Sequence, residues 1–325
     1  MPKDGTSSKE AVGTQVGMPA APSIPEKPAT APNLIQMSVS VSYGRISDFS
    51  FSATRAKAWI ADFFVLLPQN SHQETMTFNT YGNKENKSLL LIPGLGVSYE
   101  IFLPLIELLK DQFYIIAVGI DGFLLGQESQ FTSVDDQAVQ VIQYTQKNLN
   151  GHLDVAYGLS LGGKILSRIL ERNEIVIDHA IMDAAPLLPL PKWSVNPLRY
   201  YQSFNVWTCY HWTGFWKLVF HSHYFDVLLN ECKKVWLSGK GKAVRDGYKD
   251  VYTHKLESIQ GADIHFWYGS KEAFVAKPQA EHLLKLCPAA HVEVFPKMNH
   301  GQLLVDHPEE VANRILKINQ TEKTL

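Results

Sequence analysis

The stretch 154–163 constrains the fold more than any other part of the sequence. It reads Asp-Val-Ala-Tyr-Gly-Leu-Ser-Leu-Gly-Gly, and the apolar run 155–157 within it is typical of a buried strand. The residues that follow, 164–170, repeat apolar side chains at helical spacing. Glycines on both sides of a serine let a strand and a helix approach closely, and they allow a strained turn that exposes the hydroxyl. The stretch therefore favours Ser160 as a nucleophile over a plain strand–turn–helix connection.

Apolar runs alternate with helical patterns along most of the chain. Ser88-Leu-Leu-Leu-Ile92 is continuous rather than alternating, as in a strand that is buried on both faces of a parallel sheet. Such an order of strands and helices predicts an α/β fold with a mostly parallel central sheet and helices on both faces. The expected strands are 75–81, 88–92, 114–120, 155–157, 180–182, 263–268 and 291–295, and the expected helices are 101–109, 134–148, 164–170, 277–286 and 308–318.

The chain divides into three parts by composition. Residues 1–36 have few large apolar side chains, so we expect a disordered tail. Residues 37–74 are an N-terminal segment whose structure the pattern leaves open, and 75–325 form the α/β domain. The strand–helix rhythm breaks at about 187–258, which we expect to be an inserted helical cap. This insertion is rich in aromatic side chains, among them Trp193, Trp207, Trp212, Trp216, Tyr200, Tyr201, Phe204, Phe215, Phe220, Tyr224 and Phe225.

The overall composition excludes several classes of protein. The 325 residues are 45% hydrophobic and 19% charged with a net charge of −2, which is a globular composition with no electrostatic basis for binding nucleic acid. No apolar run is long enough to span a membrane. The cysteines Cys209, Cys232 and Cys287 are far apart, which favours reduced thiols in a cytoplasmic protein. They and the pair His221-Ser-His223 lack the spacing of a metal site.

A serine nucleophile needs a base and an acid that orients the base. Catalytic groups in open parallel sheets gather beyond the carboxyl ends of the strands. His300 follows the strand 291–295 after a short loop and is the expected base. Glu272, just after the strand 263–268, is the expected acid, and Asp183, at the end of the strand 180–182, is the alternative.

The oxyanion of an acyl-transfer reaction needs backbone N–H donors. Leu161 follows the serine at the start of the expected helix, where N–H groups are free. Leu95 lies in Pro93-Gly-Leu-Gly96 after the strand 88–92, and the glycines there allow a close approach of the backbone to a substrate. An ordinary glycine turn is the alternative for this loop.

With these residues in place, 75–318 resembles the α/β-hydrolase fold superfamily. The order of serine, acid and histidine is that of the superfamily, and the insertion falls where its members carry a cap or lid. Two residues depart from the common pattern: Pro93 stands where many members have histidine, and Glu272 stands where aspartate is commoner. The second departure keeps Asp183 open as the acid. The matching motifs are 90–96, 158–162, 269–272 and 299–301.

The resemblance implies a serine hydrolase that cleaves a carboxylic ester or a related acyl bond through an acyl-enzyme. The mechanism needs no metal and no organic cofactor. The partner is a small-molecule substrate, and the aromatic insertion favours an apolar acyl or leaving group. The alternatives are a thioester hydrolase, a carbon–carbon bond hydrolase or an acyltransferase that uses the same three residues, or a binding or receptor module without catalysis.

Overall fold

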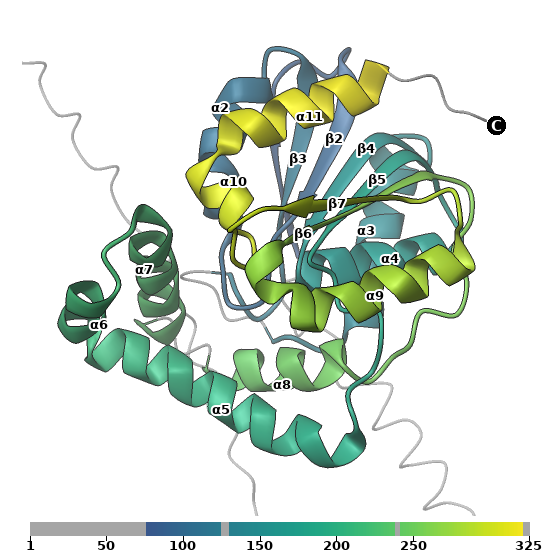
Figure 1. Ribbon diagram of the computed structural model, residues 1–325. Helices are drawn as coiled ribbons and strands as arrows, with labels where there is room; N and C mark the ends of the chain where they lie inside the picture. Colours follow the sequence, from purple (N-terminus) through teal and green to yellow (C-terminus); the bar gives the residue numbers. More distant parts are fainter. Residues whose placement is uncertain (1–75, 125–129, 238–240, 321–325) are drawn as a thin grey trace, which may run out of the picture. The chain divides into compact units, whose positions relative to one another are not determined.

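The computed structural model describes residues 76–124, 130–237 and 241–320, so the expectations for 1–36 and 37–74 lie outside the described residues. The described residues contain a seven-stranded sheet in the order β1-β3-β2-β4-β5-β6-β7 (Figure 1). Only β1 is antiparallel to its neighbour, β3, and all other adjacent strands are parallel. The expected mostly parallel sheet is therefore confirmed. The strands are β1 (Thr77–Tyr81), β2 (Lys87–Ile92), β3 (Phe113–Gly119), β4 (His152–Leu159), β5 (Val176–Asp183), β6 (Asp263–Gly269) and β7 (His291–Phe295).

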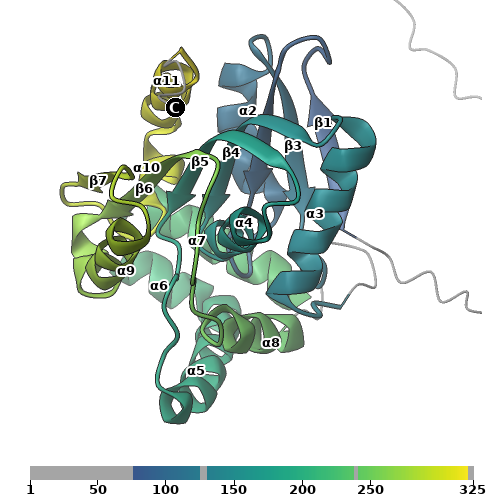
Figure 2. The same ribbon diagram turned by 90° about the vertical axis from the view of Figure 1, so that its right-hand side faces the viewer.

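Helices cover both faces of the sheet (Figures 1 and 2). Successive residues of β2 point to opposite faces: Leu89 packs in the cluster that contains α2 and α11, and Leu90 packs in the cluster that contains α3, α4 and α9. Burying each such side chain stabilises the fold by about 1.5–3 kcal/mol. The continuous apolar runs of the sequence thus follow from burial on both faces. These helices are α2 (Leu103–Leu109), α3 (Val134–Asn148), α4 (Leu161–Arg172), α9 (Ala273–Leu286) and α11 (Pro308–Gln320).

The expected helical insertion lies between β5 and β6. It comprises α5 (Lys192–His211), α6 (Thr213–Val219), α7 (His223–Leu237) and α8 (Gly241–Val251). Figure 1 shows these helices grouped beside the carboxyl ends of the strands. Within the described residues, no helix is both long enough and apolar enough to cross a membrane.

Hydrogen bonds fasten the insertion to the sheet domain. The Glu231 carboxylate of α7 accepts bonds from both the backbone N–H and the hydroxyl of Ser98, each at 3.1 Å. The fully buried Lys164 of α4 donates from its Nζ to the carbonyl of His254 after α8, at 2.7 Å. Burial lowers the pKa of Lys164 to about 8, which shows that the folded structure disfavours the charged ammonium group. The hydrogen bond to the carbonyl of His254 partly offsets this free-energy cost. The insertion is thus anchored on two sides.

The turn from β4 to α4 depends on glycine at three close contacts. Ser160 has φ 54° and ψ −108°, a conformation that non-glycine residues rarely adopt. A Cβ atom on Gly158 would lie 2.5 Å from the backbone carbonyl carbon of Gly162. A Cβ atom on Gly162 would overlap the carbonyl oxygen of Ile92, and one on Gly163 would lie 2.6 Å from the Cβ of Ala185. The start of α4 therefore packs directly against the carboxyl end of β2.

We expect Gly162→Ala to lower the free energy of unfolding by about 3 kcal/mol or more, because the new methyl group meets the rigid backbone of β2. Gly214→Ala is the matched control, since nothing lies within 4 Å of a Cβ at that position in α6. The control should change stability by no more than about 1 kcal/mol. Urea denaturation followed by circular dichroism measures both. Equal stability of the two variants would contradict the close packing of α4 on β2.

Candidate active site

The expected site residues lie at the carboxyl ends of neighbouring strands. Leu95 follows β2, Ser160 follows β4, Glu272 follows β6 and His300 follows β7. A cavity of about 720 Å³ opens at this end of the sheet, and Leu95, Ser160, Leu161 and His300 all line it. The structure therefore brings residues from three of these strand ends to one cavity.

His300 and Glu272 form a short polar contact in the site. Nδ1 of His300 lies 2.6 Å from Oε2 of Glu272, a distance typical of a charge-assisted hydrogen bond. The other carboxylate oxygen, Oε1, accepts a bond from the backbone N–H of Gly269 at 3.1 Å. Because both carboxylate oxygens are engaged, Glu272 is held in one orientation. Its bond to Nδ1 leaves Nε2 of His300 for contact with a substrate or a nucleophile.

The two loops that carry this pair are fastened to each other. The backbone N–H of Lys271 donates to the carbonyl of Met298 at 3.0 Å, and the N–H of Lys297 donates to the hydroxyl of Ser270 at 2.8 Å. A Cβ atom on Gly269 would overlap the Met298 carbonyl oxygen, so glycine permits this contact. The separation of His300 and Glu272 is thus set by the backbone and not only by side-chain rotamers.

Asp183 has a different partner. Its Oδ2 accepts a hydrogen bond from the hydroxyl of Tyr157 at 2.6 Å, and its backbone carbonyl accepts one from the N–H of Ser160 at 2.7 Å. The side chain is buried, which raises its pKa to about 6, although the bond from Tyr157 and the nearby His300 act in the opposite direction. Asp183 therefore braces the serine turn, while Glu272 contacts the histidine.

The surroundings of His300 favour its protonated form. Desolvation lowers the pKa of the imidazole, but the hydrogen bond and the negative charge of Glu272, together with Asp183, outweigh it and raise the pKa above its ordinary value. A raised pKa means that the pair contributes most stability below about pH 6.5, and that this contribution is lost as the pH rises through the pKa of the folded state. An imidazolium that forms here is therefore stabilised.

The two expected oxyanion donors border the serine. Leu161 is the first residue of α4, where backbone N–H groups have no partner within the helix and the helix dipole is positive. Leu95 lies next to Gly94, and a Cβ atom on Gly94 would be 3.5 Å from the Cβ of Ser160. The loop after β2 therefore lies against the serine turn, as an oxyanion site requires.

Side chains of the insertion form the apolar wall of the cavity. Trp216 and Phe220 of the α6 region stack with ring centroids 5.6 Å apart, and Phe225 stacks on Phe220 at 4.4 Å. Leu228, Leu229, Val244 and Val251 also line the cavity. The space next to Ser160 and His300 is thus largely apolar, which suits an apolar ligand with few polar groups.

Sequence reasoning missed two residues that support the site. Tyr157 was read only as part of the apolar strand, yet its buried hydroxyl holds Asp183. Tyr224 of α7 donates from its hydroxyl to the carbonyl oxygen of His300 at 2.7 Å and so links the insertion to the histidine loop. The aromatic richness of the insertion was the available signal for Tyr224, but it does not single out one tyrosine.

Glu272→Gln should lower the pKa of His300, because the hydrogen bond and the negative charge that raise it are lost. Asp183→Asn should lower it less, since Asp183 acts only at longer range. An NMR titration of the imidazole protons, with a His300→Gln variant to assign the signal, measures both changes. A larger decrease in Asp183→Asn would show that the wrong acid has been paired with the histidine.

Solved structures of low sequence identity share this architecture. An α/β hydrolase family protein from Desulfitobacterium hafniense is 16% identical with a TM-score of 0.61, and the match covers 74% of this chain and 99% of that one. A thermophilic esterase from Thermogutta terrifontis is 17% identical with a TM-score of 0.60, covering 76% and 94%. The enol-lactonase from Burkholderia xenovorans is 13% identical with a TM-score of 0.61, covering 76% and 96%. These likenesses establish the fold.

No curated protein matches the chain. The model of the α/β hydrolase family, in contrast, matches residues 89–314, which include most of β2, the serine turn, the whole insertion and the histidine loop. Since this match extends over most of the chain and over every strand end that contributes to the cavity, the chain belongs to the α/β hydrolase family.

Proposed function

We propose that this protein is a serine hydrolase that cleaves carboxylic esters with an apolar acyl or leaving group. The observation that carries the proposal is the 2.6 Å bond between His300 and Glu272 at a cavity that Ser160 also lines. Membership of the α/β hydrolase family supports it. The substrate is a small molecule, since the cavity measures about 720 Å³.

In the proposed reaction, the hydroxyl of Ser160 attacks the ester carbonyl and Nε2 of His300 accepts its proton. Glu272 stabilises the imidazolium that forms, and the backbone N–H groups of Leu95 and Leu161 stabilise the oxyanion. The imidazolium then protonates the departing alcohol. Water, deprotonated by His300, attacks the acyl-enzyme, releases the carboxylic acid and restores Ser160.

The apolar wall of the cavity supports the preference for an apolar substrate. Trp216, Phe220 and Phe225 stack on one another and line the cavity, together with leucine and valine side chains. Removing a methylene group from water stabilises a complex by about 0.8 kcal/mol. Thioester hydrolysis, carbon–carbon bond hydrolysis and acyl transfer use the same nucleophile, and a substrate panel distinguishes them.

Hydrolysis of p-nitrophenyl esters with acyl chains of increasing length tests the proposal. We expect kcat/KM to rise with each added methylene, by up to about fourfold, until the cavity is filled. Ser160→Ala should lower kcat by about a thousandfold or more while the protein stays folded. If the folded wild type hydrolyses no ester in the series, the protein is not an esterase and the binding-module alternative gains support.

A pair of tryptophan variants tests the role of the insertion in the same assay. Trp216 lines the cavity, whereas Trp193 lies in the same insertion and is 80% exposed. Trp216→Ala should reduce the preference for long acyl chains, and Trp193→Ala should leave the preference unchanged. An equal effect of the two variants would contradict the placement of the acyl chain against the aromatic wall.

A further inference from the structure

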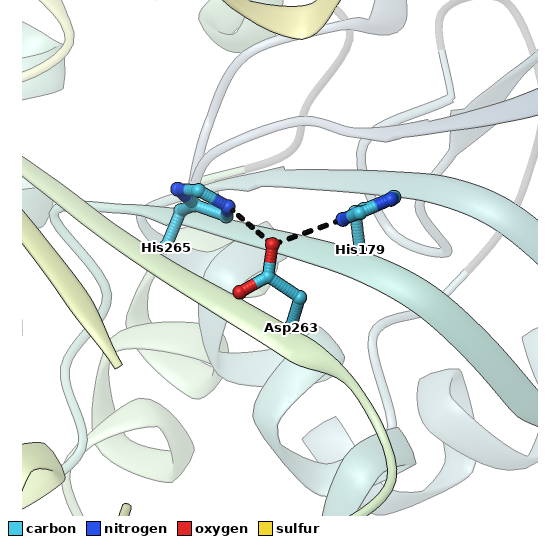
Figure 3. Close-up of side chains that lie close together, drawn as sticks. All are labelled: His179, Asp263 and His265. Atoms are coloured by element: carbon cyan, nitrogen blue, oxygen red, sulfur yellow. Dashed lines mark hydrogen bonds and ion pairs between the residues drawn. The ribbon is translucent and has the colours of Figure 1, made fainter. Parts of the chain in front are cut away.

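Three side chains with metal-ligating atoms meet at the end of the sheet away from the candidate active site. His179 lies on β5, and Asp263 and His265 lie on β6 (Figure 3). Asp263 is the first residue of β6, while Glu272 follows the other end of the same strand. The cluster is therefore separate from the cavity that contains Ser160.

Strand register places these side chains on one face of the sheet. His179 is the register partner of Asp263 across β5 and β6, so the two side chains point the same way. Asp263 and His265 are two residues apart on one strand and share a face. His265 is in turn the register partner of His291 on β7. Three adjacent strands thus contribute to one polar cluster on the sheet face that also carries Ile181 and Trp267.

The ligating atoms are close enough to bind a single ion. Oδ2 of Asp263 lies 3.0 Å from Nδ1 of His179 and 2.9 Å from Nε2 of His265, and Figure 3 shows the carboxylate between the two rings. All three atoms lie within 4.8 Å of one another. Zinc binds imidazole nitrogen and carboxylate oxygen at about 2.0–2.2 Å. Small rotations of the two rings therefore bring all three atoms to ligand distance from one ion.

Burial and charge favour a cation at this position. His179 is 5% exposed and His265 is 8% exposed, so both imidazoles are largely removed from water. In the part of the chain that the structure describes, the ion pairs of Asp263 are all with histidines: His179, His265 and His291. Unlike lysine or arginine, none of these three partners carries a permanent positive charge.

We propose that His179, Asp263 and His265 bind a divalent transition-metal ion of the zinc type, which ties β5 to β6 at their amino-terminal end. In the metal-free state, imidazole N–H groups point at the carboxylate. On metal binding, the proton of each ring moves to its other nitrogen, and the vacated nitrogen binds the ion. Nitrogen and carboxylate ligands suit zinc. His291 is more exposed, stacks on His265 with centroids 4.9 Å apart, and lies with its Nε2 3.4 Å from Oδ1 of Asp263, where a fourth ligand can bind.

Isothermal titration calorimetry with Zn²⁺ on the chelator-treated full chain tests this site. We expect one Zn²⁺ per chain and a rise in the melting temperature on binding. His265→Gln should weaken binding by about tenfold or more, since a direct ligand is lost. His152→Gln is the matched control, because His152 belongs to a second, more exposed group with Asp154 and Asp178. Unchanged affinity in His265→Gln, or loss of binding only in His152→Gln, would overturn the proposal.

A spectroscopic measurement on the wild type keeps the proposal falsifiable if His265→Gln does not fold. Co²⁺ in a tetrahedral site of nitrogen and oxygen ligands has an intense visible absorption, whereas Co²⁺ on exposed carboxylates is octahedral and weakly coloured. We expect the intense spectrum, and we expect Zn²⁺ to abolish it by competition. A weak octahedral spectrum, or no binding of either ion, would show that the cluster is only a hydrogen-bonded brace between strands.

Discussion

The close approach of α4 to β2 is the contact on which the candidate active site depends. It exists because Gly162 has no side chain to meet the carbonyl of Ile92, and because Gly158 and Gly163 allow the neighbouring backbone contacts. The same packing holds Ser160 at φ 54°, a conformation that would otherwise relax. It also sets the N-terminus of α4 beside the loop after β2, so one packing contact positions both the candidate nucleophile and the candidate oxyanion donors.

The parallel register of the sheet supplies the rest of the site. β4, β5, β6 and β7 are adjacent and parallel, so the loops after them meet at one edge. The loops after β6 and β7 are joined by one backbone hydrogen bond and one bond from a backbone N–H to the hydroxyl of Ser270, which fix the separation of Glu272 and His300. Tyr224 then ties the insertion to the histidine loop. The insertion that forms the aromatic wall is thus joined by a hydrogen bond to the loop of the candidate base.

Much of the fold could be predicted from the sequence, because burial on both faces leaves a strong local pattern. The apolar runs that became β2 and β3 are examples, and the glycines around Ser160 indicated the strained turn. Local pattern also placed His300 and Glu272 after strands. It favoured Glu272 as the acid but left Asp183 open, because that choice depends on which carboxylate the histidine loop reaches after folding.

Contacts that depend on the register of strands far apart along the chain could not be predicted from the sequence. Tyr157 and Asp183 are 26 residues apart, and their hydrogen bond exists only because β4 and β5 pair in one particular register. His179 and Asp263 are 84 residues apart, and no local spacing links them. Short ligand spacings are the local signal of a metal site, and a cluster whose members lie on two strands does not produce that signal. The sequence also could not show whether the aromatic residues of the insertion pack in its core or line a cavity.

The central claim is that Ser160 is an activated nucleophile, and labelling with a fluorophosphonate probe tests it most directly. Mass spectrometry of the labelled protein should find a single phosphonyl group on Ser160, and the folded Ser160→Ala variant should carry none. Prior protonation of His300 at acidic pH should slow the labelling, because the base must be neutral to accept the proton. A folded wild-type protein that stays unlabelled, or that carries the label on another residue, would contradict the account.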